Sequence, residues 1–108
     1  MIFELDKVNS IANHFLAELR DIKVQKDRMR FRKNIERIGE IMAYELSKNL
    51  DYKAIAVQTP LGTKHTTTIA EPVVLCSILR AGLALHQGFI YFFDTAENGF
   101  VSAYRNHY

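Results

Sequence analysis

Apolar side chains at helical spacing mark the first part of the chain. From Ile11 to Ile22 they recur every three or four residues, so they fall on one face of a helix. Asn9 and Ser10 come directly before this series, and either side chain can accept a hydrogen bond from an open amide of the first turn. The pattern predicts a helix over about residues 10–21.

The same spacing returns in a longer series that begins at Phe31 and ends at Leu50. Asp27 stands before it as a candidate N-cap, and a helix is predicted over about residues 27–49. Gly39 lies inside this helix, where glycine is unfavourable by roughly 1 kcal/mol relative to alanine. We therefore expect the backbone of a neighbouring element to pass close to Gly39.

After Leu50 the period changes from helical to extended. Residues 54–58 are short and apolar, residues 59–62 read Thr-Pro-Leu-Gly, and residues 63–70 are rich in β-branched side chains. Proline in the second and glycine in the fourth position are typical of a β-turn. The segment is predicted to form a β-hairpin.

The last third of the chain predicts a strand, a helix and a second strand. Residues 73–79 are almost all apolar, which is typical of a parallel strand that is covered on both faces. After a break, residues 83–93 are apolar enough for a buried helix. Asn98 and Gly99 suit a turn, and residues 100–104 alternate as a strand does. These elements form a βαβ unit of about thirty residues.

Together the elements predict one α/β domain over residues 1–108, helical over 1–50 and built of the hairpin and the βαβ unit over 51–108. Two parallel strands and a hairpin leave a sheet edge at which further strands should pair. Either a partner chain completes the sheet, or the sequence is the front portion of a larger α/β domain. We favour the second interpretation.

Composition agrees with a globular domain, because 48% of the 108 residues are hydrophobic and 24% are charged. A chain of this size is expected to bury roughly two-thirds of the surface that its unfolded form exposes. The single cysteine, Cys76, excludes an intrachain disulfide and is expected to be an inert core residue of its apolar strand. No apolar stretch is long enough to cross a membrane, and Glu4 and Asp6 stand where a signal peptide would be basic and then apolar. We therefore expect a cytoplasmic protein without a membrane partner.

The junction between the apolar strand and the next helix carries a pattern suited to a phosphate ligand. Ligands of parallel α/β sheets bind at the carboxyl ends of the strands, where a helix N-terminus presents unpaired amides and a positive dipole end. Ala81 and Gly82 allow the backbone to approach closely, and the guanidinium of Arg80 suits phosphate oxygens. The pattern favours a pyrophosphate site. A surface arginine followed by an ordinary turn glycine is the alternative.

Arg105 occupies the corresponding place after the next predicted strand. The strand ends of a right-handed βαβ unit open on the same edge of the sheet, so Arg80 and Arg105 are expected to face one crevice. Alternatively, Arg105 is an isolated surface residue.

Four segments, in the same order and spacing, resemble the uracil phosphoribosyltransferase family. They are residues 78–83 (Ile-Leu-Arg-Ala-Gly-Leu), 59–62 (Thr-Pro-Leu-Gly), 31–32 with 38–45 (Phe-Arg and Ile-Gly-Glu-Ile-Met-Ala-Tyr-Glu), and 104–105 (Tyr-Arg). The resemblance implies the N-terminal part of a type I phosphoribosyltransferase (Rossmann-like) fold. It also implies pyrimidine salvage, in which 5-phosphoribose passes from 5-phosphoribosyl 1-diphosphate to uracil and gives uridine monophosphate and pyrophosphate.

Site residues and partners follow from the same resemblance. It places Arg80, Ala81 and Gly82 in the family's pyrophosphate loop, and Arg105 beside the same substrate. It further implies Mg²⁺ bound with the diphosphate, a homo-oligomer of two or more copies and, in some members, GTP as an activator. No residue of this chain receives a catalytic or a metal-binding role.

The chain also departs from the family pattern. A loop that cradles the ribose 5-phosphate and a C-terminal region that reads uracil have no counterpart here, so we expect the chain alone to be inactive. Cys76 and Ser77 stand where the family has an apolar residue and proline, and Gln87 stands where an acidic residue is usual.

Two alternatives to the enzyme function stay open. The chain is either a non-catalytic relative that binds a nucleotide or RNA, or a dimerisation scaffold.

Basic residues gather between Arg20 and Arg37, where eight cations face three acidic side chains. This segment is either an effector site for a nucleotide or an RNA contact, or it is a solvated face or a subunit contact. Phe31 is the only aromatic residue within it, so base stacking has little support and no nucleic-acid partner is expected. The four histidines show no metal-ligand spacing, and no metal site is expected from them.

Overall fold

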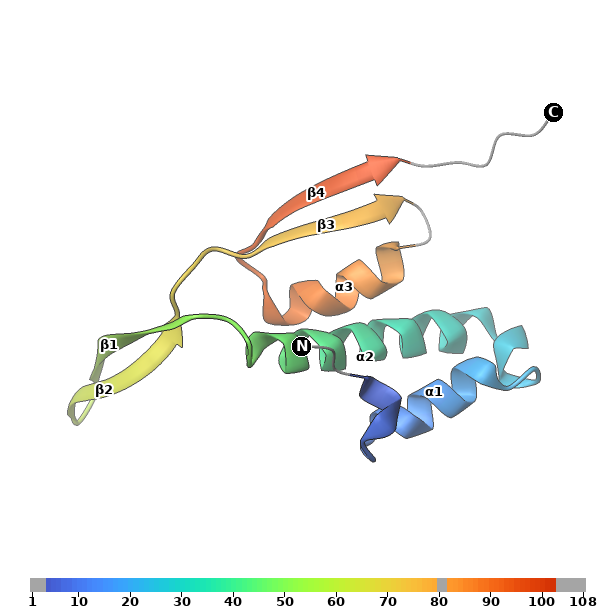
Figure 1. Ribbon diagram of the computed structural model, residues 1–108, viewed down its shortest axis with the longest axis horizontal. Helices are drawn as coiled ribbons and strands as arrows, with labels where there is room; N and C mark the ends of the chain where they lie inside the picture. Colours follow the sequence, from blue (N-terminus) through green and yellow to red (C-terminus); the bar gives the residue numbers. More distant parts are fainter. Residues whose placement is uncertain (1–3, 80–81, 103–108) are drawn as a thin grey trace.

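A pair of helices, a hairpin and a βαβ unit follow one another along the chain, as the sequence predicts (Figure 1). The computed structural model describes residues 4–79 and 82–102. In chain order the elements are the short 3-10 helix η1 (Leu5–Lys7), α1 (Ala12–Arg20), the 3-10 helix η2 (Val24–Lys26), α2 (Arg28–Ser47), β1 (Tyr52–Thr59), β2 (Gly62–Ile69), β3 (Val74–Leu79), α3 (Leu83–Phe92) and β4 (Glu97–Ser102).

Polar side chains set the starts of the first two long helices. The Ser10 hydroxyl accepts a hydrogen bond from the Ala12 amide over 3.1 Å, and an Asp27 carboxylate oxygen accepts one from the Arg30 amide over 3.1 Å. Both satisfy amides that have no partner inside the helix. The predicted N-cap at Asp27 is confirmed. The hydrogen bond predicted for Ser10 is also made, although α1 begins at Ala12 and Ser10 therefore lies two positions before its first residue.

The predicted hairpin is confirmed. Strands β1 and β2 pair antiparallel, with Tyr52 opposite Ile69 and Thr59 opposite Gly62. Gly62 has a φ of +135°, which only glycine adopts without strain, so the Thr-Pro-Leu-Gly turn needs its glycine. The hairpin projects away from the helices at one end of the molecule (Figure 1).

The βαβ unit is the part of the molecule that carries the predicted site. Strands β3 and β4 pair parallel, from Val74 opposite Glu97 to Leu79 opposite Ser102. Helix α3 connects them and lies between this sheet and α2 (Figure 1). The mixed α/β class, with two N-terminal helices, a hairpin and a βαβ unit, is therefore as predicted.

Two details of the βαβ unit differ from the prediction. Asn98 and Gly99 do not form a turn, because both lie inside β4 opposite Leu75 and Cys76. The turn comes earlier, where the Ala96 amide donates to the Phe93 carbonyl oxygen over 3.1 Å. The turn propensity of the pair is overridden by strand pairing, and the last predicted strand residues lie outside the described range.

Burial of β3 also differs from the prediction. Ser77 points toward α3 and is buried, whereas Cys76 points to the opposite face and is exposed. The expectation that Cys76 is a buried core residue was wrong because it assumed cover on both faces of the strand. Within the described part of the chain, only α3 packs on this sheet.

The molecule as a whole is more open than a chain of its size usually is. Its radius of gyration is 17.6 Å, against about 13 Å for a compact domain of this length. It exposes 8903 Å², against about 6,200 Å² for a compact domain of this mass. The expected burial of two-thirds is therefore not reached. Among the described residues, the apolar ones that are buried are Ala12, Ile38, Ala43 and Phe93.

Candidate functional site

The carboxyl ends of the two parallel strands lie side by side. Leu79, the last residue of β3, is the partner of Ser102, the last residue of β4. The chain segments that follow both strands therefore start from the same edge of the sheet. This is the edge at which ligands of parallel α/β sheets bind.

Gly82 begins the helix that follows β3 and fits tightly against that strand. Its amide donates a hydrogen bond to the Ile78 carbonyl oxygen over 2.9 Å, and its own carbonyl oxygen accepts one from the His86 amide over 2.9 Å. A Cβ at this position would lie 2.5 Å from the Ser77 hydroxyl oxygen and 2.9 Å from the Ile78 carbonyl oxygen. Glycine is needed here for close approach, since its φ of −80° is open to any residue.

The first turn of α3 is suited to an anion. Among the described residues, no side chain forms a capping hydrogen bond at the start of α3, where Gly82 is the N-cap residue. The first amides of an α-helix have no partner inside the helix, and the helix dipole adds partial positive charge there. Because Gly82 holds this turn against the end of β3, the amides open toward the edge where Leu79 and Ser102 end.

His86 anchors this helix to the second strand. The ring is buried, its Nε2 lies 2.8 Å from the Asn98 side-chain oxygen, and its centroid is 5.0 Å from that of Phe100. The Asn98 side-chain nitrogen donates to the Ala96 carbonyl oxygen over 3.2 Å, so the oxygen faces His86 and Nε2 carries the proton. Sequence reasoning missed this pair, because Asn98 was assigned to a turn.

The predicted site residues divide between the described and the undescribed parts of the chain. Gly82 starts α3 at the carboxyl edge of the sheet, as predicted. Arg80, Ala81 and Arg105 lie outside the described residues, so their predicted roles stay predictions. The strands that precede Arg80 and Arg105 end as register partners.

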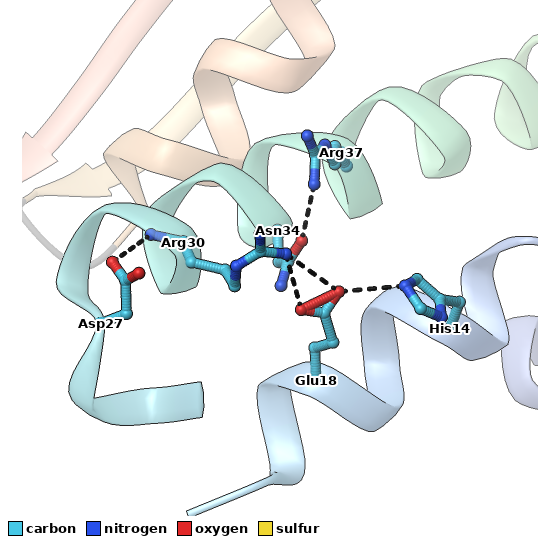
Figure 2. Close-up of polar contacts among 6 residues, drawn as sticks. All are labelled: His14, Glu18, Asp27, Arg30, Asn34 and Arg37. Atoms are coloured by element: carbon cyan, nitrogen blue, oxygen red, sulfur yellow. Dashed lines mark hydrogen bonds and ion pairs between the residues drawn. The ribbon is translucent and has the colours of Figure 1, made fainter. Parts of the chain in front are cut away.

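Polar contacts join part of the basic segment to α1 and to neighbouring residues of α2, as Figure 2 shows. Arg30 forms an ion pair with Glu18 over 3.0 Å, and Glu18 also lies 3.1 Å from His14 Nε2. Arg37 donates to the Asn34 side-chain oxygen over 3.1 Å, and its guanidinium lies 5.2 Å from the centre of the Phe15 ring. These contacts give Arg30 and Arg37 partners that the sequence alone did not show.

A small hollow of about 220 Å³ lies beside this cluster, lined by Asp27, Met29, Arg30, Lys33 and Arg37. Arg30 is half-exposed, and ion pairs at such positions contribute at most about 1 kcal/mol. The effector and RNA interpretations of this segment stay predictions.

Within residues 4–79 and 82–102, no group of three or more His, Cys, Asp or Glu side chains is placed to hold a metal ion. The helices of the described chain are also too short or too polar to span a membrane.

Comparison with known proteins identifies the family. The family model described as "Uracil phosphoribosyltransferase" matches residues 8–108. The chain belongs to the uracil phosphoribosyltransferase family. This confirms the resemblance carried by the four sequence segments.

Individual relatives agree with this assignment. A uracil phosphoribosyltransferase from Porphyromonas gingivalis is 49% identical over 106 residues, which cover 98% of this chain and 49% of that protein. One from Sulfolobus acidocaldarius is 39% identical over 95 residues, covering 85% of this chain and 43% of the relative. The solved structure of the AQ2163 protein from Aquifex aeolicus superposes with a TM-score of 0.81 at 28% identity, over 98% of this chain and 50% of that one. The chain thus spans about half the length of the relatives it matches.

Proposed function

We propose that this chain supplies the diphosphate-binding half of a uracil phosphoribosyltransferase site. In the proposed reaction, 5-phosphoribose passes from 5-phosphoribosyl 1-diphosphate to uracil, and uridine monophosphate and pyrophosphate form. The observation that carries the proposal is the shared edge of β3 and β4, at which Gly82 holds the open first turn of α3.

Each proposed site residue has a separate task. The amides that follow Gly82 would hold oxygens of the diphosphate, in a backbone position that Ala81 and Gly82 leave uncrowded. Arg80 would place its guanidinium on the same group, and Arg105 would approach it from the end of β4. Two arginines and a helix N-terminus together match a ligand that carries several negative charges.

The chemistry explains why these groups would promote transfer. The bond between the ribose C1 and the diphosphate oxygen breaks, and a bond from that carbon to a uracil nitrogen forms. Negative charge accumulates on the leaving pyrophosphate while positive charge develops on the ribose. Donors fixed around the leaving group stabilise the transition state more than the ground state, which is the source of rate acceleration.

Magnesium is implied by the family rather than by the described residues. Those at the carboxyl edge, such as Ser77, Gly82 and Ser102, offer hydroxyl and carbonyl oxygens but no carboxylate. Mg²⁺ is usually bound by one or two carboxylates together with substrate phosphates. This part of the chain does not build a metal site by itself, so we propose that the ion arrives with the diphosphate.

We further propose that the chain alone binds diphosphate without turning substrate over. The loop that would cradle the ribose 5-phosphate and the region that would read uracil have no counterpart among its residues. The chain matches only about half the length of the relatives, which supports this division.

The test measures binding and turnover separately. Calorimetric titration with magnesium pyrophosphate should show one site, weakened roughly tenfold or more by Arg80→Ala, because a hydrogen bond to a charged group contributes about 1.5–3 kcal/mol. Lys53→Ala, at an exposed position of β1, is the matched control and should bind as the unmodified chain does.

Turnover of labelled 5-phosphoribosyl 1-diphosphate with uracil should be absent for this chain. Formation of uridine monophosphate would contradict the proposal that this chain alone binds diphosphate without turning substrate over. Binding of RNA or a nucleotide in place of pyrophosphate would favour the regulatory alternative, and an oligomer that ignores all these ligands would favour the scaffold.

A further inference from the structure

Near its start, the helix that carries the proposed diphosphate site rests on the sheet at two points, one on each strand. On β3, Gly82 lies against Ser77, whose hydroxyl oxygen would be 2.5 Å from a Cβ on that glycine. On β4, the buried ring of His86 lies against Asn98 and Phe100. The two points are about one helical turn apart. The first turn of α3 is therefore held against both strands.

His86 stands where the open part of this helix gives way to the bonded part. Its amide donates to the Gly82 carbonyl oxygen over 2.9 Å, which is the first α-helical hydrogen bond of α3. The amides of residues 83–85 come before this bond, and an α-helix leaves such amides without a partner of its own. The His86 side chain is thus fixed to β4 directly after the amides that would hold the diphosphate.

The contact between His86 and β4 has a defined geometry. The Asn98 side-chain nitrogen donates to the Ala96 carbonyl oxygen over 3.2 Å, so the Asn98 side-chain oxygen is turned toward His86 Nε2, 2.8 Å away. The same ring lies 5.0 Å, centroid to centroid, from Phe100. A ring that is held by a hydrogen bond and by an aromatic contact resists sliding along the strand. It therefore gives the first turn of α3 one position relative to β4.

That position matters because the proposed site draws on groups that follow both strands. The open amides belong to the helix that follows β3, whereas Arg105 follows β4 in the sequence. Hydrogen bonds to an anion weaken when a donor is misaligned, and donors that are already fixed need no reorganisation on binding. Binding groups of this kind have to be held to within about 0.5 Å, usually by side chains that do not touch the ligand themselves.

We propose that His86 and Asn98 are positioning residues for diphosphate binding, because their hydrogen bond holds the open first turn of α3 in place beside the end of β4. The inference rests on the proposed function, since it concerns the same site. Neither side chain contacts the ligand, and both act through the backbone amides of residues 83–85. Diphosphate affinity then depends on a hydrogen bond that lies one helical turn behind the ligand.

The test compares calorimetric titrations with magnesium pyrophosphate for the unmodified chain and three variants. His86→Leu fills much of the space of the ring but cannot donate a hydrogen bond, and should weaken binding roughly tenfold because the amides lose their fixed position. Asn98→Ala removes the acceptor from an exposed strand position and should weaken binding to a similar extent. His86→Gln keeps a side-chain N–H that can reach Asn98, and should recover most of the affinity.

A further variant and a second readout separate positioning from a general loss of stability. Ser10→Ala removes a capping hydrogen bond of α1, which packs on α2 and the two 3-10 helices, so it should lower stability and leave the affinity unchanged. In amide NMR spectra without ligand, His86→Leu should shift the signals of residues 83–85, and His86→Gln should restore them. Ser10→Ala should not move these signals.

The outcomes distinguish this inference from the proposed function. If the unmodified chain does not bind pyrophosphate, the proposed function fails and the inference fails with it. If the chain binds, and folded His86→Leu and Asn98→Ala bind equally well, the proposed function stands and the positioning role is overturned. A loss of affinity that His86→Gln does not restore also overturns it. Circular dichroism shows whether each variant is folded, and if His86→Leu is not, Asn98→Ala decides.

Discussion

Gly39 in α2 and Gly88 in α3 face each other where the two helices cross, with backbone against backbone. A Cβ on Gly39 would lie 2.5 Å from the Leu85 carbonyl oxygen and 3.2 Å from the Gly88 Cα. A Cβ on Gly88 would collide with the Glu36 carbonyl oxygen and would lie 2.9 Å from the Gly39 Cα. The close approach predicted from Gly39 is therefore confirmed, and it fixes the distance between α2 and the βαβ unit.

Replacing Gly88 by alanine should separate the two helices. The added methyl group meets backbone atoms on α2 that cannot rotate away, so the helices must shift. We expect the free energy of unfolding to fall by about 1–3 kcal/mol, the usual cost of overpacking. Urea denaturation followed by circular dichroism measures this change.

Gly99→Ala is the control for that substitution. A Cβ at Gly99 would come no closer than 3.8 Å to the Cys76 sulfur, which is ordinary contact. Its effect should stay within about 0.5 kcal/mol. If Gly88→Ala and Gly99→Ala lowered the free energy of unfolding equally, the distance between α2 and α3 would not be set by Gly39 and Gly88.

Removal of the Asp27 cap should destabilise α2 at its first turn. Asp27→Ala removes the acceptor of the Arg30 amide hydrogen bond and should lower the free energy of unfolding by about 0.5–2 kcal/mol. Asp27→Asn keeps an acceptor of similar capping strength and should recover most of the loss. Asp51→Ala, at an exposed position outside the helix, should change little, and a loss as large as that of Asp27→Ala would argue against the cap.

The contact between His86 and Asn98 should be measurable as a coupling energy. His86→Ala removes a buried ring and a 2.8 Å hydrogen bond, so a loss of about 1–3 kcal/mol is expected. Combined with Asn98→Ala in a double-mutant cycle, the pair should couple by about 0.5–1.5 kcal/mol. His65→Ala, on an exposed strand position, should have little effect. A coupling near zero would mean that the pair does not join α3 to β4.

Local sequence signals predicted the features that depend on nearby residues. The cap at Asp27, the turn that ends in Gly62 and the helix from Leu83 each follow from chemistry within a few positions. The close packing at Gly39 was also predictable, because a glycine inside a helical pattern needs a reason outside that helix.

Features set by distant contacts were not predictable in this way. Asn98 lies in a strand rather than a turn because β3 pairs with it and His86 holds its side chain. Cys76 is exposed because α3 covers one face of β3, and the strand's apolar sequence did not show which face would stay open. The position of Gly82 at the carboxyl edge was predicted, whereas the roles of Arg80 and Arg105 rest on the family resemblance.

The central claim is that the edge beside Gly82 binds diphosphate, and amide NMR tests it most directly. Titration of the ¹⁵N-labelled chain with magnesium pyrophosphate should shift the amides of Gly82 and Leu83, and Arg80→Ala should weaken the response. Shifts confined to Arg30, Lys33 and Arg37, with Gly82 and Leu83 unmoved at saturation, would place the anion on the basic segment and would contradict the account.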